Sequence, residues 1–344
     1  MTWRMPPETA RHERTWMAFP VEGQTLGDEA AEREEGYAAW TAVAHAVAEF
    51  EPVSMLVDPS ESARARRMLS GDVEIVEAPV DEFWMRDSGP TFVLGDDGRL
   101  GAVDWIFNGW GSPAWAEWTK AAQHARLIAE ATGAELVSST LVNEGGGIHV
   151  DGEGTVLLTE TVQLDPRRNP YADRQRVEAE MARTIGATTA VWLPRGLTRD
   201  YDDFGTNGHV DIVAIIASPG RLLLHAQQNP EHPDHAVTRA LRAHLEQQTD
   251  AAGRRFEIVD LPAPSTLRDD EGFVDWSYVN HLVTNDGVVA CGFGDEQADA
   301  AARAILAEAY PGRRVVTVDA RPLFDRGGGI HCITQQQPSA GVSR

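Results

Sequence analysis

Residues 326–338 read Arg-Gly-Gly-Gly-Ile-His-Cys-Ile-Thr-Gln-Gln-Gln-Pro, and five of these residues, Gly-Gly-Gly-Ile-His, also occupy positions 145–149. A turn of glycines allows the backbone to approach a ligand closely, because glycine has no side chain to exclude it. The first copy follows Glu144, and the second copy leads into Cys332. A motif that recurs in this way predicts internal pseudo-symmetry.

The apolar pattern outside this motif alternates short strands with single helices about five times. Helices are expected over residues 28–50, 59–69, 115–132, 171–185, 234–248 and 295–309. Strands are expected over residues 53–57, 73–76, 83–94 (with a break at 88–90), 100–105, 135–137, 155–159, 190–193, 209–217, 221–226, 256–261, 277–284, 287–291 and 314–318. No long Pro/Gly/Ser linker interrupts the series, so the sequence predicts one α/β domain over residues 1–344, built from repeated ββαβ units.

The composition limits the partners and the compartment. The 344 residues carry a net charge of −23 with a pI near 4.8, so nucleic acid and anionic membranes are poor partners. Small cations would be attracted, although solubility alone also explains an acidic surface. The N-terminus lacks the apolar segment of a signal peptide, and no apolar run approaches the roughly 18 residues of a membrane span. We therefore expect a cytoplasmic protein.

The two cysteines differ in their surroundings, and they form neither a disulfide framework nor a CxxC zinc pair. Cys291 lies in an apolar strand and is interpreted as structural. A free cysteine such as Cys332 is also commonly a small buried hydrophobic residue. However, the glycines before Cys332 and the glutamines after it favour a nucleophile, whose thiolate a cationic substrate would stabilise.

His209 and Asp211 are the next candidates. On a strand, residues two apart point to the same face, so one ligand could contact both. The pair fits a general acid/base beside a carboxylate, and it equally fits a hydrogen-bonded pair at a strand end. His149 and Asp151 repeat the pattern, so a metal site from these pairs is an open alternative, although no third ligand stands at a diagnostic spacing. Glu144 is either solvated or aimed at a ligand.

An aromatic segment surrounds a further charged pair. Arg86 and Asp87 follow Phe83 and Trp84, and charges in apolar surroundings need partners. They form either a structural ion pair or part of a site for a cationic ligand. The segment around Trp105 either lines a pocket or belongs to the core.

Together these motifs carry a family resemblance that spans about residues 4–338. The motifs, in order, are residues 84–90 (Trp-Met-Arg-Asp-Ser-Gly-Pro), 103–108 (Val-Asp-Trp-Ile-Phe-Asn), 144–155 (Glu-Gly-Gly-Gly-Ile-His-Val-Asp-Gly-Glu-Gly-Thr), 207–211 (Asn-Gly-His-Val-Asp) and 327–338. The chain resembles the agmatine deiminase branch of the guanidine-modifying (pentein) superfamily, which includes bacterial peptidylarginine deiminases. This resemblance implies a five-bladed, pseudo-symmetric α/β propeller around a central active site, with the two glycine motifs at related edges of the pocket.

The resemblance also implies roles for individual residues. Cys332 would be the nucleophile, His209 the acid/base, and Asp87 and Asp211 the carboxylates that bind a guanidinium. Glu144 would orient His209 or share the substrate. The substrate-binding set would be Asp87, Asp211, Trp84, Trp105 and Gly329. His331 would point to the opposite side of a strand from Cys332 and would not be the base. Neither a metal nor an organic cofactor is implied, and a homodimer is a possible assembly.

One segment departs from the family pattern. Residues 196–206 are longer than in agmatine deiminases, and Gly205 stands where the family has an acidic residue that helps to hold the amino end of agmatine. Asp200, Asp202 or Asp203 could substitute, or the substrate could be another guanidino compound such as an arginine derivative or peptidylarginine. An amidinotransferase and a non-catalytic guanidinium-binding protein are the alternatives from other classes. The first expectation is deimination of agmatine to N-carbamoylputrescine and ammonia, in polyamine metabolism.

Overall fold

The computed structural model describes residues 2–340 and contains five small mixed sheets, so the α/β expectation is confirmed. Two of the sheets have four strands. The first contains, in order across the sheet, β1 (Trp3–Arg4), β5 (Thr91–Gly95), β6 (Leu100–Ile106) and β7 (Glu135–Val142). The second contains β17 (Gln335–Pro338), β2 (His12–Ala18), β3 (Val53–Val57) and β4 (Val73–Glu77). The strands of the three-stranded sheets are β10 (Thr189–Leu193), β9 (Thr155–Thr159) and β8 (Ile148–Val150); β11 (Ala214–Ser218), β12 (Arg221–Ala226) and β13 (Glu257–Pro262); and β14 (Leu282–Val283), β15 (Gly287–Gly292) and β16 (Arg314–Asp319).

Every sheet repeats one order of pairing. A first strand pairs antiparallel with a second strand, and the second pairs parallel with a third, as β5, β6 and β7 do. The same order holds for β8–β9–β10, β11–β12–β13, β14–β15–β16 and β17–β2–β3. A parallel pair needs a crossover connection, and in each unit a helix provides it. The repeat predicted from the strand pattern is therefore present in the pairing.

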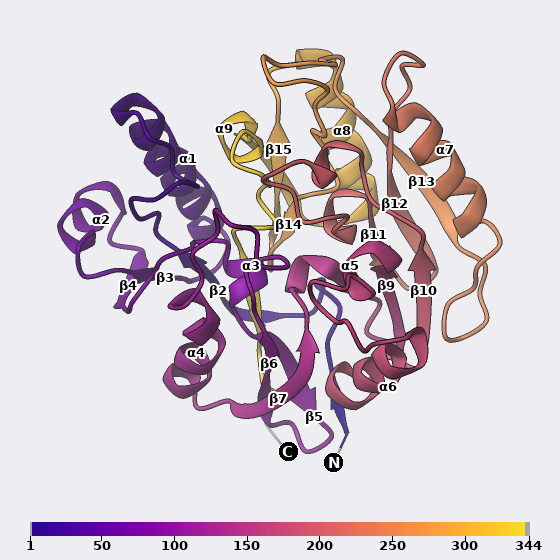
Figure 1. Cartoon of the computed structure of the whole chain (residues 1–344), viewed down its shortest axis with the longest axis horizontal. Helices are drawn as coiled ribbons and strands as arrows, with labels where there is room; N and C mark the ends of the chain where they lie inside the picture. Colours follow the sequence, from indigo (N-terminus) through magenta and orange to yellow (C-terminus); the bar gives the residue numbers. More distant parts are fainter. Residues whose placement is uncertain (1, 341–344) are drawn as a thin grey trace.

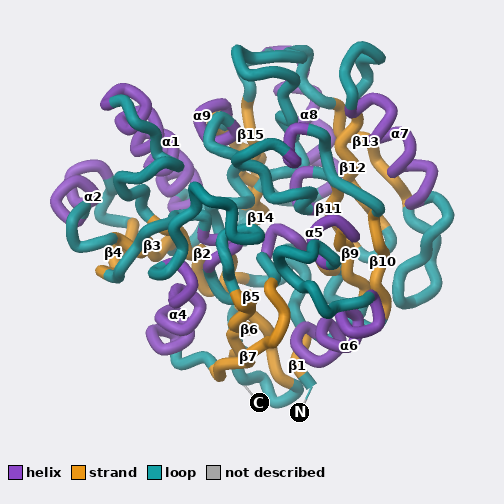
Figure 2. Tube along the Cα trace, viewed as in Figure 1, coloured by secondary structure: helices purple, strands orange, loops and turns teal. Residues whose placement is uncertain are grey.

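The longer helices lie outside the sheets, whereas the short helix α3 lies near the centre (Figure 1; Figure 2). The α-helices are α1 (Ala30–Ala48), α2 (Ser62–Met68), α3 (Met85–Ser88), α4 (His124–Thr132), α5 (Glu160–Gln163), α6 (Arg174–Ile185), α7 (Asp234–Leu245), α8 (Glu296–Ala309) and α9 (Arg321–Phe324). The 3-10 helices are η1 (Ala121–Gln123), η2 (Gly145–Gly147), η3 (Arg199–Tyr201) and η4 (Val210–Ile212). Among these described helices, none has the length and apolar composition of a membrane span.

Two hydrophobic clusters form the interior. The larger cluster joins residues of all five sheets, and the smaller one gathers around Trp3, Trp105 and Trp192 between β6, β9 and α6. The sheet of β17 and β2 brings the two ends of the chain together, since Gln335 is paired with Trp16 and Ser339 donates its N–H to the carbonyl of Arg11. The larger core therefore closes only when the C-terminal strand is in place.

Three expected strands are wrong at the segments that carry candidate residues. Residues 85–88 form α3, residues 210–212 form η4, and of residues 277–284 only Leu282–Val283 is a strand. In each segment the expected strand begins several residues too early, because N–H groups there bond to nearby carbonyls instead of to a neighbouring strand, as those of Asp87, Val213 and Asn280 do. Helix α2 also begins at Ser62 rather than at 59, because the carboxylate of Asp58 accepts from Ser60, Val80 and Lys120.

Candidate active site

Each of the five units contributes to one buried cluster from the segment that immediately precedes its first strand. The contributions are Asp87 before β5, Glu144 before β8, His209 and Asp211 before β11, Asn280 before β14, and Cys332 before β17. All six side chains are buried. The structure therefore brings together the five catalytic candidates and adds Asn280, which the sequence did not single out but which occupies the equivalent position of the fourth unit.

Gly146 marks the point where these groups converge. A Cβ built on Gly146 would lie 2.6 Å from Nδ1 of His209 and 2.9 Å from an oxygen each of Asp211 and Asp87. A side chain at this position would fill the space among the three groups. This is the physical reason for glycine in the first copy of the repeated motif.

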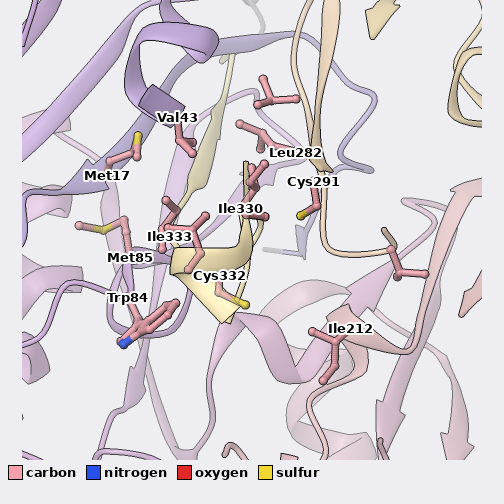
Figure 3. Close-up of a cluster of buried hydrophobic side chains, with 14 of the residues drawn as sticks. Met17, Val43, Trp84, Met85, Ile212, Leu282, Cys291, Ile330, Cys332 and Ile333 are labelled. Carbon is pink, nitrogen blue, oxygen red and sulfur yellow. The ribbon is translucent and has the colours of Figure 1, made fainter. Parts of the chain in front are cut away.

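Cys332 lies in a turn between α9 and β17, not on a strand. Ile330 and Ile333 flank it and anchor the turn in the larger core (Figure 3). Its Sγ accepts from Nδ2 of Asn280 at 3.2 Å and donates to Oδ2 of Asp211 at 3.5 Å. Burial and the carboxylates of Asp211 and Asp87 raise the pKa of the thiol well above its usual value. The thiol is thus protonated until a cation offsets those carboxylates.

His209 faces two carboxylates. Its Nε2 lies 3.3 Å from Oε2 of Glu144, and its Nδ1 lies 3.8 Å from Oδ1 of Asp87. Burial opposes the charged form, but the carboxylates of Asp87 and Glu144 outweigh it and raise the pKa of His209 to about 9. A protonated His209 can therefore donate a proton near neutral pH.

Glu144 is fixed by an arginine that the sequence analysis missed. Nε of Arg168 donates to both oxygens of Glu144 at 2.9 and 3.1 Å, and neither side chain is exposed. Arg168 also donates to Asp165 and to the carbonyl of Thr206. Burial opposes ionisation of Glu144, but the charge of Arg168 and the contact with His209 hold its pKa below the usual value. Glu144 thus orients His209 as a permanent carboxylate.

Asp87 is held by two N–H donors. Oδ1 accepts from the backbone of Gly146 at 3.0 Å, and Oδ2 accepts from the indole Nε1 of Trp110 at 2.9 Å. Burial, against the opposing charge of His209, raises the pKa of Asp87 to about 6. Trp110 has a φ of 58°, a left-handed conformation that is uncommon for a bulky residue. This strained backbone directs the indole at the carboxylate.

Asp211 accepts from His331, whose side chain lies beneath the site. Nδ1 of His331 is 2.8 Å from Oδ2 of Asp211, and its Nε2 is 2.7 Å from Oε1 of Glu8. Burial opposes ionisation of Asp211, but the hydrogen bond and charge of His331 hold its pKa below the usual value. The expectation that His331 points away on a strand is therefore wrong in its geometry, because residues 330–333 form a turn. His331 thus contacts Asp211, while His209 contacts Glu144.

Of the remaining substrate-binding candidates, Trp84 and Gly329 lie beside Cys332, whereas Trp105 does not. Trp84 lines the narrow cavity beside Cys332, which has a volume of about 10 Å³. A Cβ on Gly329 would lie 2.4 Å from Oδ1 of Asn280, and its backbone N–H faces the thiol. Trp105, by contrast, packs in the smaller hydrophobic cluster and donates to Thr91, so the expectation that it lines the pocket is wrong. Trp110 lines the cavity instead.

The unusual segment 196–206 is organised by Asp200. Its buried carboxylate accepts from the backbone N–H groups of Thr206, Gly208 and His209, at 2.6, 2.7 and 3.0 Å. A Cβ on Gly205 would lie 2.1 Å from the carbonyl oxygen of Asp200, which excludes an acidic residue there. Asp200 therefore holds the backbone before His209. Asp202 and Asp203 line a neighbouring cavity of about 260 Å³, which shares Phe204 and Gly327 with the cavity beside Cys332.

The remaining candidates have structural partners. His149 accepts from the N–H of Ile216 and lies 3.7 Å from Glu8, while Asp151 accepts from the N–H groups of Glu153 and Thr155. Within residues 2–340, His, Cys, Asp and Glu side chains form no group of three or more that could hold a metal ion. Sγ of Cys291 donates to the carbonyl of Asn280, and burial raises its pKa to about 12.

Two buried polar atoms of the cluster have no hydrogen-bond partner, Nδ1 of His209 and Oδ1 of Asp211. An unpartnered buried polar atom is costly, so such atoms are expected where a ligand completes the site. Both belong to side chains that face the space at Gly146, with Asp87 beside them. The arrangement suits a small, planar cation with several N–H donors, held against a thiol and a protonated histidine.

Comparisons with known proteins agree with this geometry. A family model described as Porphyromonas-type peptidyl-arginine deiminase matches residues 4–338. A Streptomyces coelicolor protein named "Putative agmatine deiminase" is 55% identical over 98% of this chain and 99% of its own length. The agmatine deiminase of Stutzerimonas stutzeri is 38% identical over 98% of this chain and 96% of its own. The solved structure of the Enterococcus faecalis agmatine deiminase has a TM-score of 0.91 at 31% identity, covering 99% of this chain and 97% of that one.

Proposed function

The chain belongs to the Porphyromonas-type peptidyl-arginine deiminase family, and we propose that it is an agmatine deiminase, which converts agmatine and water into N-carbamoylputrescine and ammonia. One observation carries the proposal: Cys332, His209 and the carboxylates of Asp87 and Asp211 face one space around Gly146. The product is a precursor of putrescine, so the reaction belongs to polyamine formation. The substrate is a small cationic guanidino compound.

The guanidinium binds between Asp87 and Asp211. Its planar fork of N–H donors matches paired carboxylates, and Oδ1 of Asp211 has no other partner. The bound cation offsets the two charges that raise the pKa of Cys332, so the thiolate forms when substrate is present. The cavity beside Cys332 holds only about one water. Phe204 and Trp115, which contact each other, are among the residues that line it.

The first half-reaction transfers the amidino group to sulfur. The thiolate of Cys332 attacks the guanidinium carbon and gives a tetrahedral adduct. His209 gives its proton to one nitrogen, the C–N bond breaks, and ammonia leaves. A thiouronium then links Cys332 to the remaining part of the substrate. The N–H of Gly329 and the amide of Asn280 lie against the sulfur in the free enzyme and support its negative charge.

The second half-reaction hydrolyses the thiouronium. His209, now neutral, takes a proton from water, and the hydroxide attacks the same carbon. The C–S bond breaks and restores the thiolate of Cys332, the proton of the new hydroxyl passes to solvent, and the ureido product leaves. Glu144, fixed by Arg168, keeps the imidazole oriented through both half-reactions.

The five sheets form the five blades of a pentein propeller in this proposal, and residues 1–344 act as a single catalytic domain. The repeated order of strand pairing supports the blades. The position of each site residue, immediately before the first strand of its unit, supports a central active site.

A substrate panel tests the proposed function. Agmatine, arginine, a peptidylarginine and other guanidino amines are compared by ammonia release, with the organic product identified. Agmatine should give the highest kcat/KM and a ureido product. If another guanidino compound ranks far above agmatine, the substrate is misassigned, and a guanidinylated amine product would identify an amidinotransferase instead.

A further inference from the structure

His331 is held between two carboxylates. Its Nδ1 is 2.8 Å from Oδ2 of Asp211, and its Nε2 is 2.7 Å from Oε1 of Glu8. A carboxylate only accepts hydrogen bonds, whereas a neutral imidazole has a single N–H to donate. Both contacts are satisfied together only if His331 carries two protons. All three side chains are buried.

Glu8 comes from the N-terminal segment between β1 and β2, more than three hundred positions away from its partner. Besides His331, it contacts Nη1 of Arg86 at 3.4 Å and Nε2 of His149 at 3.7 Å. The other titratable groups near Glu8 are His281 and Tyr310, which contact each other, and His12, whose Nε2 lies 3.0 Å from the backbone carbonyl of Glu8. Glu8 is thus the carboxylate that faces Arg86, His149 and His331 together.

We propose that Glu8 is a positioning residue for the reaction: it keeps His331 as an imidazolium, and His331 in turn keeps Asp211 ionised and turned toward the guanidinium. Oδ2 of Asp211 is occupied by His331 and the thiol, which leaves Oδ1 free for substrate. The inference rests on the proposed function through the guanidinium that Asp211 binds.

The charge of Glu8 also sets the pH range over which His331 stays protonated. With Glu8 present, two carboxylates, those of Glu8 and Asp211, stabilise the imidazolium. Without Glu8, one of these carboxylates is missing, so His331 loses a proton at lower pH. At the acid end His331 remains an imidazolium paired with Asp211, whereas at higher pH the neutral imidazole no longer supports the charge of Asp211. The loss should therefore grow with increasing pH.

The variant Glu8→Gln tests this chain of contacts, because glutamine keeps the size and a hydrogen bond while removing the charge. We expect kcat/KM for agmatine to stay near the wild-type value at the acid end of roughly pH 5–8, where an ordinary histidine titrates, and to fall about 10-fold toward the alkaline end. Histidine NMR, assigned with His331→Gln, should show His331 protonated throughout this range in the wild type and titrating within it in Glu8→Gln.

Glu51→Gln is the matched control. Glu51 is another buried carboxylate on a histidine, 3.0 Å from Nδ1 of His12, and its other partners are Thr15 and Asn285. Nε2 of His12 contacts the backbone carbonyl of Glu8 and not its carboxylate, so Glu51→Gln disturbs the same segment while the charge of Glu8 stays in place. Its loss should leave the pH dependence of kcat/KM unchanged. Glu8→Asp, which retains the charge, should restore most of the activity that Glu8→Gln loses.

The outcomes separate the inference from the proposed function. A loss in Glu8→Gln that is equal at every pH, or no loss, would overturn the positioning role. If Glu8→Gln does not fold, the wild-type NMR titration decides, since a His331 that titrates normally refutes the proposal. Inactivity of the wild type toward agmatine contradicts the proposed function, whereas a permanently protonated His331 supports the inference with any substrate that the panel identifies.

Discussion

Replacing Trp110 with phenylalanine tests whether Asp87 must be ionised to bind substrate. The indole N–H is 2.9 Å from Oδ2 of Asp87, whose pKa burial raises to about 6. A hydrogen bond to a charged group contributes about 1.5–3 kcal/mol, and one pKa unit corresponds to about 1.4 kcal/mol. Loss of the indole donor should therefore raise the pKa of Asp87 by about 1–2 units.

The sign of the effect follows from the form that binds. Asp87 binds the guanidinium when ionised, so binding is lost as the pH falls through its pKa. In Trp110→Phe the acid limb of kcat/KM should move about 1–2 pH units upward, which lowers kcat/KM about 2- to 10-fold at pH 7 and little at pH 9. Ammonia release from agmatine, measured across this pH range, gives the profile.

Trp105→Phe is the matched control, because both indoles are 5% exposed and Trp105 also donates at 2.9 Å, but to Thr91. Its acid limb should coincide with that of the wild type. An unshifted acid limb in Trp110→Phe, or the same shift in both variants, would refute the assigned role of Asp87.

Four further substitutions test separate parts of the structure. Cys332→Ser should lower kcat about a thousandfold or more without unfolding the protein, whereas Cys291→Ala should keep most activity; a reversal would show that the wrong cysteine was assigned. Asn280→Ala removes the donor on Sγ of Cys332 and should slow alkylation of the thiol by iodoacetamide about 5- to 10-fold at fixed pH; an unchanged rate would contradict that role. Gly205→Glu should cost about 1–3 kcal/mol of unfolding free energy, seen as a lower Tm, because its Cβ meets the carbonyl of Asp200; an equally stable variant would show that segment 196–206 can rearrange.

The sequence predicted the reactive groups better than the backbone that carries them. Cys332, His209, Glu144, Asp87 and Asp211 lie in motifs whose composition is unusual for a core, and the structure brings them together. The assignment of His209 and Asp211 to a strand relied on the apolar run that follows them. Their actual conformation depends on the loop before them, in which Asp200 accepts from the backbone N–H groups of Gly208 and His209. The period of apolar residues does not reveal this contact.

The site residues that the sequence analysis missed have partners that are remote from them in the sequence. Glu8 and Arg168 look like ordinary surface charges in the sequence, and only tertiary contacts with His331 and Glu144 make them part of the site. Trp110 could not be preferred over Trp105 from composition, since both lie in one aromatic segment. Asn280 precedes the first strand of its unit, as the other site residues do. This shared position can be recognised only after the strands of the five units have been aligned with one another.

The pairing of β17 with β2 has a consequence for synthesis of the protein. The strand β2 leaves the ribosome early, but its antiparallel partner is residues 335–338, just after Cys332. Domains fold as their chain emerges from the N-terminus, yet here the thiol can join His209 and Asp211 only after the last strand is released. Catalytic activity therefore begins only after residues 332–338 have emerged, and a ribosome-bound nascent chain that ends before Cys332 carries the carboxylates and the histidine without the nucleophile.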